Sequence, residues 1–121
     1  MIPTIYTWLL ANSTVTSLLG DGSNLKVYRD EAPQGTAVPY VRWLLVGGTP
    51  ENYLSDAPGI DTSRYQFDVF ALTQTSCDQI YVAIRNVIEQ HGHIVSFNLT
   101  ERDPETRVYR ISFDAQFWVT R

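Results

Sequence analysis

The sequence predicts an α+β fold: a mainly antiparallel sheet of four to five strands, one long helix on its apolar face, and additional short N-terminal helices. Apolar and polar residues alternate through residues 64–72 and 108–120, as in strands with one covered face. Residues 77–88 carry an apolar stripe at helical spacing. At 121 residues the chain is long enough for one core, so residues 1–121 are expected to form a single domain.

The first twenty residues predict two short helices. Pro3 fits a first helical turn. The apolar face of this helix would consist of Ile2, Ile5, Tyr6 and Leu9. Ser13 is expected to cap the second helix, which Gly20 ends.

Two strands and a long loop are predicted next. Residues 25–28 and 40–46 are rich in β-branched and aromatic residues, and the breakers Pro33, Gly35 and Pro39 lie between them. Residues 47–63 hold two prolines and several glycines, which predicts a loop. Loops of this length inside a small domain are commonly functional.

The second half predicts a strand, a helix and two more strands. Thr75 is placed to cap the helix, and Gly92 to end it. Residues 94–100 and 108–120 then alternate, joined by a turn at 101–107. The inward residues of the first of these strands are expected to be Val95, Phe97 and Leu99.

Charge and composition argue against several functional classes. The net charge is −4, whereas proteins that bind nucleic acid are usually basic. Lys26 is the only lysine, so nearly all basic residues are arginines, which suit forked ion pairs at protein contacts. The N-terminus has neither a basic start nor a long apolar run, so we expect no signal peptide, no membrane span and a reducing cytoplasm.

The sequence lacks the usual catalytic and metal-binding patterns. His91 and His93 alone do not complete a zinc site, and Cys77 lies on the apolar helix stripe, which indicates a core thiol. Neither glycine-rich stretch matches a phosphate-binding loop, and no nucleophile elbow is present. Asp56 and Asp61 lack calcium-loop spacing. We therefore expect no enzyme, no metal and no cofactor.

The polar face of the last strand suggests a contact surface. Arg110, Asp114 and Gln116 are typical of a solvated face, but Trp118 is not. Either Trp118 packs under the N-terminal helix, or a neighbouring molecule covers it. Because tryptophan and arginine are enriched at interfaces, Arg110 and Trp118 are candidate interface residues.

Three stretches together resemble a known family. They are EAPQGTAVPYVRWLLV at 31–46, GTPENYLSDAPGID at 48–61 and RDPETRVYRISFDAQFWV at 102–119. In this order and spacing they are similar to the tail completion, or tail terminator, proteins of long-tailed phages, prophages and gene transfer agents. The resemblance covers essentially the whole chain, and no single motif in it is catalytic.

The resemblance implies a structural role in the virion tail or neck, assembled in the host bacterial cytoplasm. Such proteins form a six-membered ring of one repeated subunit. The ring caps the tail tube protein, ends tube growth and offers a surface to the neck or head-completion protein. DNA passes through the ring without specific binding, and no membrane is involved. Alternatives are another neck protein, such as a head-completion connector, and a monomeric ligand-binding domain.

Two sets of residues are assigned within that implied ring. The acidic chain suits a DNA conduit, so a polar strand face with Asp68, Asp114 and Gln116 is expected to face the lumen. The long loop is expected to contact the next subunit or the tube. Its most anchor-like residues are Asn52, Tyr53 and Leu54.

Overall fold

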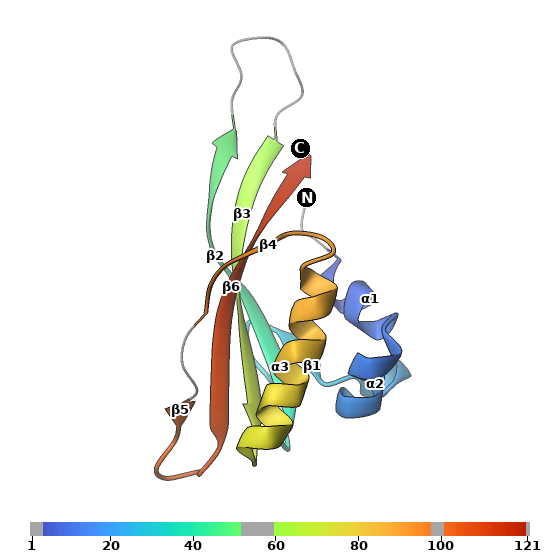
Figure 1. The fold of residues 1–121 in the computed structure, drawn as a ribbon, viewed down its shortest axis with the longest axis vertical. Helices are drawn as coiled ribbons and strands as arrows, with labels where there is room; N and C mark the ends of the chain where they lie inside the picture. Colours follow the sequence, from blue (N-terminus) through green and yellow to red (C-terminus); the bar gives the residue numbers. More distant parts are fainter. Residues whose placement is uncertain (1–3, 52–59, 98–100, 121) are drawn as a thin grey trace.

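The computed structural model describes residues 4–51, 60–97 and 101–120. Helices and strands follow one another along the chain in this order: α1 (Ile5–Leu10), α2 (Ser13–Leu19), a 3-10 turn (Gly22–Asn24), β1 (Val27–Arg29), β2 (Tyr40–Glu51), β3 (Ile60–Ala71), α3 (Gln74–Ile88), β4 (His93–Phe97), β5 (Glu101–Arg102) and β6 (Tyr109–Thr120). All three α-helices lie on one side of a single sheet (Figure 1).

The sheet has the strand order β1-β2-β3-β6-β4, and β5 also pairs with β6. β1 runs parallel to β2, whereas the pairs β2–β3, β3–β6, β4–β6 and β5–β6 are antiparallel. The predicted α+β fold, with one long helix on a mainly antiparallel sheet, is confirmed. The parallel β1–β2 pair makes the sheet mixed, a feature that local residue patterns cannot predict.

The hairpin of β2 and β3 corrects the predicted loop at residues 47–63. Strand pairing continues to Glu51 and Ile60, after a bulge between Leu45 and Gly47. β1 pairs only with Val41, Arg42 and Trp43 of β2, so within the described sheet the outer edge of β2 is unpaired at Pro50. Because proline has no backbone N–H to donate, it is tolerated at such an unpaired edge. Gly47, Gly48 and Pro50 are therefore strand residues and not the loop breakers that the sequence predicted, whereas Pro58 and Gly59 lie outside the described residues.

The core lies between the sheet and α3, which contacts β3 and β6. Phe67 and Phe113 stack with ring centroids 5.0 Å apart, and Tyr81 of α3 meets Phe113 edge-on at 5.4 Å. α1 and α2 pack against α3. The buried residues of α3 confirm the predicted apolar stripe; they are Cys77, Ile80, Ala83, Ile84, Val87 and Ile88.

Two helix caps differ from the predicted ones by one or two residues. Asn12, not Ser13, caps α2, because its side-chain oxygen accepts a hydrogen bond from the Val15 backbone N–H at 3.0 Å. Thr73, not Thr75, caps α3 through the Ser76 N–H at 3.1 Å. Neighbouring cap-forming residues compete, and the choice between them depends on where the preceding backbone becomes extended.

The end of α3 also differs from its prediction. The helix ends at Ile88, before Gly92. A Cβ at Gly92 would lie 2.5 Å from the Gln116 carbonyl oxygen and 2.6 Å from the Phe117 ring. Glycine is therefore needed here for the close approach of the chain to β6, rather than for helix termination.

β4 has its side chains placed differently from the predicted alternation. Val95 and Phe97, expected to point inward, are 41% and 61% exposed, whereas Ile94 packs against the core. A register shift between Ile94 and Ser96 leaves Val95 as the extra residue. Phe97 pairs with the buried Phe113, but it lies on the edge strand β4 and stays exposed. Leu99 lies outside the described residues.

Cys77 is a core thiol, as predicted, and its reactivity follows from its surroundings. It is fully buried, and burial together with the charge of Asp78 raises its pKa to about 11. Since only the thiolate reacts, native protein at pH 8 should resist iodoacetamide, and unfolded protein should be alkylated fully. Mass spectrometry after timed labelling measures this. Rapid alkylation of the native protein would contradict the burial of Cys77.

Candidate functional site: the open face of the sheet

The α-helices of the described chain lie on one side of the sheet (Figure 1). The outward side chains on the opposite side form a polar and aromatic surface, here called the open face. Pairing registers align its rows across β2, β3 and β6. The open face comprises Tyr40, Arg42 and Leu44 of β2, Arg64, Gln66, Asp68 and Phe70 of β3, and Arg110, Ser112, Asp114, Gln116 and Trp118 of β6. Alternation along each strand sends these side chains away from the core.

Asp68 is the centre of a charged network on the open face. Its side chain is 0% exposed. Oδ2 accepts a hydrogen bond from Arg42 Nε at 3.1 Å, and Arg42 Nη2 forms an ion pair with the same oxygen. Oδ1 accepts from Gln66 Nε2 at 2.9 Å, Arg110 Nη2 at 3.1 Å and the Ser112 hydroxyl. One carboxylate thus joins three neighbouring strands.

The network keeps Asp68 ionised. Burial by itself raises the pKa of this carboxyl group, but hydrogen bonds from Ser112, Arg42 and Gln66, together with the positive charge of Arg110, lower the pKa below its ordinary value. Arg42 and Arg110 remain partly exposed, with side-chain exposures of 30% and 38%. The face therefore presents guanidinium groups held in fixed positions by a buried anion.

A second ion pair lies further along the same face. Arg64 donates through Nε to Asp114 Oδ2 at 2.9 Å and through Nη2 to the Ser96 hydroxyl at 3.2 Å. Arg64 is largely exposed and Asp114 partly buried. Gln116 occupies the next outward position of β6, directly opposite Arg64. Both acids of the open face are consequently neutralised by arginine.

Aromatic rings border the Asp68 network at one end. Tyr40 and Phe70 stack at 4.8 Å, and Tyr28 meets Tyr40 at 6.2 Å. The guanidinium groups of Arg42 and Arg110 lie 5.7 and 5.9 Å from the Phe70 ring. Flat rings and forked cations in this arrangement resemble the composition of protein–protein contact surfaces.

Trp118 marks the other end of the open face. It is 54% exposed and meets His93 edge-on at 4.8 Å. The residue that packs under α1 is instead Phe117, whose ring lies 5.6 Å from Trp8, and Trp8 also stacks on His91 at 3.8 Å. The first alternative for Trp118, packing under the N-terminal helix, is therefore wrong.

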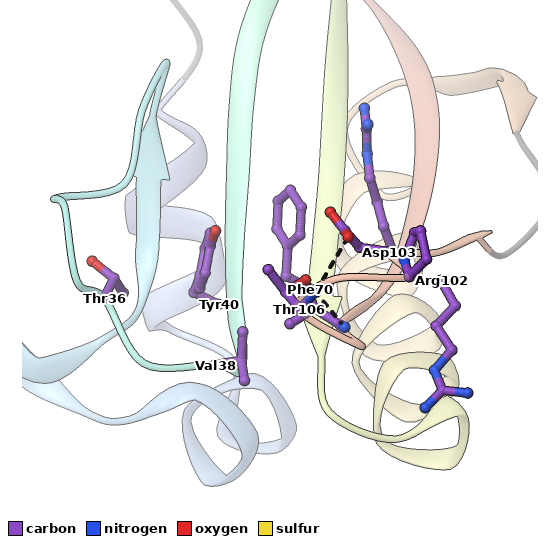
Figure 2. Close-up of a pocket in the computed structure, with 10 residues that line it drawn as sticks. Thr36, Val38, Tyr40, Phe70, Arg102, Asp103 and Thr106 are labelled. Carbon is purple, nitrogen blue, oxygen red and sulfur yellow. Dashed lines mark hydrogen bonds between the residues drawn. The ribbon is translucent and has the colours of Figure 1, made fainter.

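A pocket of about 580 Å³ opens at the aromatic end of the open face (Figure 2). It lies between the segment after β1 and the turn from β5 to β6. Its lining consists of Thr36, Val38, Tyr40, Phe70, Arg102, Asp103, Pro104, Thr106, Val108 and Arg110. The pocket has an apolar floor, and the guanidinium of Arg110 beside it is bound to Asp68. The guanidinium of Arg102 lies instead over the Tyr109 ring.

The sequence located these residues only in part. Asp68, Asp114, Gln116, Arg110 and Trp118 all lie on one face, as their alternation predicted. Asn52, Tyr53 and Leu54 lie outside the described residues. Sequence reasoning missed Arg42 and the role of Asp68 as a shared anchor, because strand register brings them together from positions far apart in the chain.

Among the described residues, no group of three or more His, Cys, Asp and Glu side chains could hold a metal ion. In the same part of the chain, no helix is long and apolar enough to cross a membrane. The charged groups of the open face pair with one another.

Comparison with known proteins agrees with this architecture. A chain of the virion of a native gene transfer agent particle superposes with a TM-score of 0.67 at 16% identity, covering 97% of this chain and 92% of that one. At this identity the similarity concerns the fold alone. No curated protein matches. The family model described as tail completion protein gp17 matches residues 3–120. The chain therefore belongs to the tail completion protein family and is a structural component of a phage tail, as its resemblance implied.

Proposed function

We propose that this chain forms a ring, expected to be hexameric, that caps the end of the tail tube, ends tube growth and joins the tail to the neck or head-completion protein. The observation that carries the proposal is the open face, a polar and aromatic sheet surface without helices over it, in a member of the tail completion family. A cap needs such a surface because it must bind copies of itself and the tube.

The two ends of the open face suit contacts with other subunits. Trp118 is a large aromatic residue more than half exposed, and such residues commonly act as interface anchors. Arg110 sits beside the pocket with part of its guanidinium accessible. We assign both residues to contacts with the next subunit or the tube, together with Asn52, Tyr53 and Leu54.

The middle of the open face suits the lumen. Asp68, Asp114 and Gln116 lie there, with Asp68 buried. The two acids pair with the three arginines Arg42, Arg64 and Arg110, which weakens the attraction of these arginines for phosphate groups. DNA could then slide past without being held. A ring structure in which these side chains are buried between subunits would refute the lumen assignment.

The role of the loop can be tested with the double variant Tyr53→Ala, Leu54→Ala. If these residues anchor the cap, the variant should fail to complement a virus that lacks the gene, and its tubes should vary in length because growth is not stopped. Infectivity counts and tube lengths by electron microscopy measure both effects. The matched control is Val82→Ala, an exposed substitution on α3. Full complementation by the double variant would contradict the assignment.

A further inference from the structure

The described sheet has two open edges. β1 pairs only with residues 41–43 of β2, so no strand of the described sheet lies beside the rest of β2, whose end extends past the helices (Figure 1). At the other end of the strand order, β4 pairs within this sheet with β6 alone. An open edge presents backbone N–H and C=O groups that a strand of another molecule can bind.

The stretch of β2 that is open to pairing runs from residue 45 to residue 49. The N–H of Asp30 donates to the Trp43 carbonyl oxygen at 2.7 Å, so Trp43 directs its backbone groups away from β3. Leu45 lies two residues further and before the bulge, and by alternation it directs its backbone groups the same way. Pro50 has no N–H to donate, so the open stretch ends before it. It is five residues long, as is β4.

Neither open edge is protected by charge. Proteins commonly keep edge strands from pairing with other molecules by placing lysine or other charged side chains on them. Residues 45–49 and 93–97 contain no Asp, Glu, Lys or Arg. Two such edges can approach each other without bringing like charges together.

Both open edges carry exposed apolar side chains instead. Leu45 and Val46 of β2 are exposed, as are Val95 and Phe97 of β4. These are four of the eight large apolar residues that are exposed in the described part of the chain. Removing them from water against another molecule would be favourable, and exposed apolar groups gathered in this way mark contact surfaces.

Leu45 and Phe97 lie on the same side of the sheet. Leu45 pairs with Tyr65, and Phe97 pairs with Phe113. Both partners are buried on the helix side, and directly opposite residues of neighbouring strands point to one face. If the two edges met in one continuous sheet, Leu45 of one copy and Phe97 of another could therefore pack together.

The strand directions suit a second copy related by rotation. The pairs β2–β3, β3–β6 and β4–β6 are all antiparallel, so β2 and β4 of one chain run in opposite directions. A rotation about an axis along the strands leaves the direction of β4 unchanged in the next copy. That β4 would then lie antiparallel to β2, which is the more stable arrangement of two strands.

We propose that residues 45–49 of β2 pair antiparallel with β4 of a second copy of this chain, with Leu45 opposite Phe97. The inference rests on the proposed ring and specifies its subunit contact. Trp118, which meets His93 of β4 at 4.8 Å, lies next to this contact. Because two different edges meet, the contact is head-to-tail, the type that closes into a ring when the rotation between copies is suitable.

Disulfide capture tests the pairing directly. A variant with both Leu45→Cys and Phe97→Cys should give a ladder of covalently linked subunits under mild oxidation, in solution or with polymerised tube. Within one chain the two positions are three strand spacings apart, about 14 Å, which is too far for a disulfide. Buried Cys77 stays unreactive.

Two controls make the capture specific. When Val82→Cys on α3 replaces Phe97→Cys, linked subunits should form at least several-fold more slowly, and equal rates would overturn the proposal. Leu45→Cys alone should give almost no linked subunits, because a head-to-tail contact keeps the two copies of Leu45 apart. Rapid dimer formation by this single variant would show that β2 pairs with β2, and would overturn the proposal as well.

Charge at the edges provides the second arm. Leu45→Lys should reduce ring formation on tube ends several-fold, and adding Phe97→Glu should restore it through an ion pair with the next copy. Val82→Lys, at an equally exposed position of α3, should leave ring formation unchanged. Electron microscopy counts the rings, and circular dichroism checks that each variant is folded. Loss of rings by folded Leu45→Lys that Phe97→Glu does not restore would contradict the pairing of these two residues.

The two proposals fail in different ways. If rings assemble on tube ends and no link between positions 45 and 97 is trapped within them, the edge pairing is wrong and the cap remains. If the linked ladder forms in solution and tube ends stay bare, the edge pairing stands and the capping function is wrong.

Discussion

Replacing Ile84 by alanine is expected to lower the free energy of unfolding by about 2–5 kcal/mol. Ile84 is fully buried on the face of α3 that packs on the sheet, so the truncation leaves a cavity between them. Urea unfolding followed by circular dichroism measures the loss.

The matched control for this change is Val82→Ala on the same helix. Val82 is 52% exposed, so its truncation should change the unfolding free energy by about 0.5 kcal/mol or less. Coincident unfolding curves for Ile84→Ala and the wild type would place Ile84 outside the core and contradict the packing of α3 on the sheet.

Replacing Asp68 by asparagine is expected to cost about 2–3 kcal/mol at pH 7, less than the about 3–5 kcal/mol typical of fully buried pairs. Asparagine keeps the size of the side chain but leaves Arg42 and Arg110 without their shared anion. The partial exposure of both arginines lets water compensate some of the loss, which explains the smaller value. Urea unfolding at several pH values measures the effect.

The pH dependence of this cost has a definite sign. The folded-state pKa of Asp68 is lowered, so ionised Asp68 stabilises the fold above its unfolded-state pKa of about 3.9. This contribution is lost as the pH falls through the folded-state pKa. The difference between wild type and Asp68→Asn should therefore be constant from about pH 7 to 5 and shrink below about pH 4. A difference that grows on acidification would contradict the network.

Asp114→Asn is the matched control on the same face. Asp114 pairs with the largely exposed Arg64, so the loss should be only about 0–1 kcal/mol. An equal loss of unfolding free energy for both substitutions would mean that the burial of Asp68 adds nothing to its contribution to stability.

The fold could be predicted from sequence where one residue pattern dominated. The alternation around Phe67 and Phe113, and the stripe through Ile80 and Ile84, each describe an element that buries one face, and both were confirmed. Local patterns failed where pairing between distant strands decides the outcome. The hairpin beyond Gly47 depends on backbone pairing with β3, which offsets the weak strand preference of glycine and proline.

The candidate site could be predicted less completely. Alternation correctly placed Asp68, Asp114 and Trp118 on the polar face of their strands, because each strand exposes every second side chain. It could not show that Arg42 and Arg110 share Asp68, since that requires the register of three strands. The pocket likewise depends on two connecting segments meeting over the sheet.

The central claim is that the chain forms a ring at the end of the tail tube. The most direct test is the light-scattering mass of the purified chain, of 13.8 kDa per subunit, with and without polymerised tube. The expected result is a ring of several subunits, either already formed in solution or formed only when tube ends are present. A chain that stays monomeric in both conditions would contradict it.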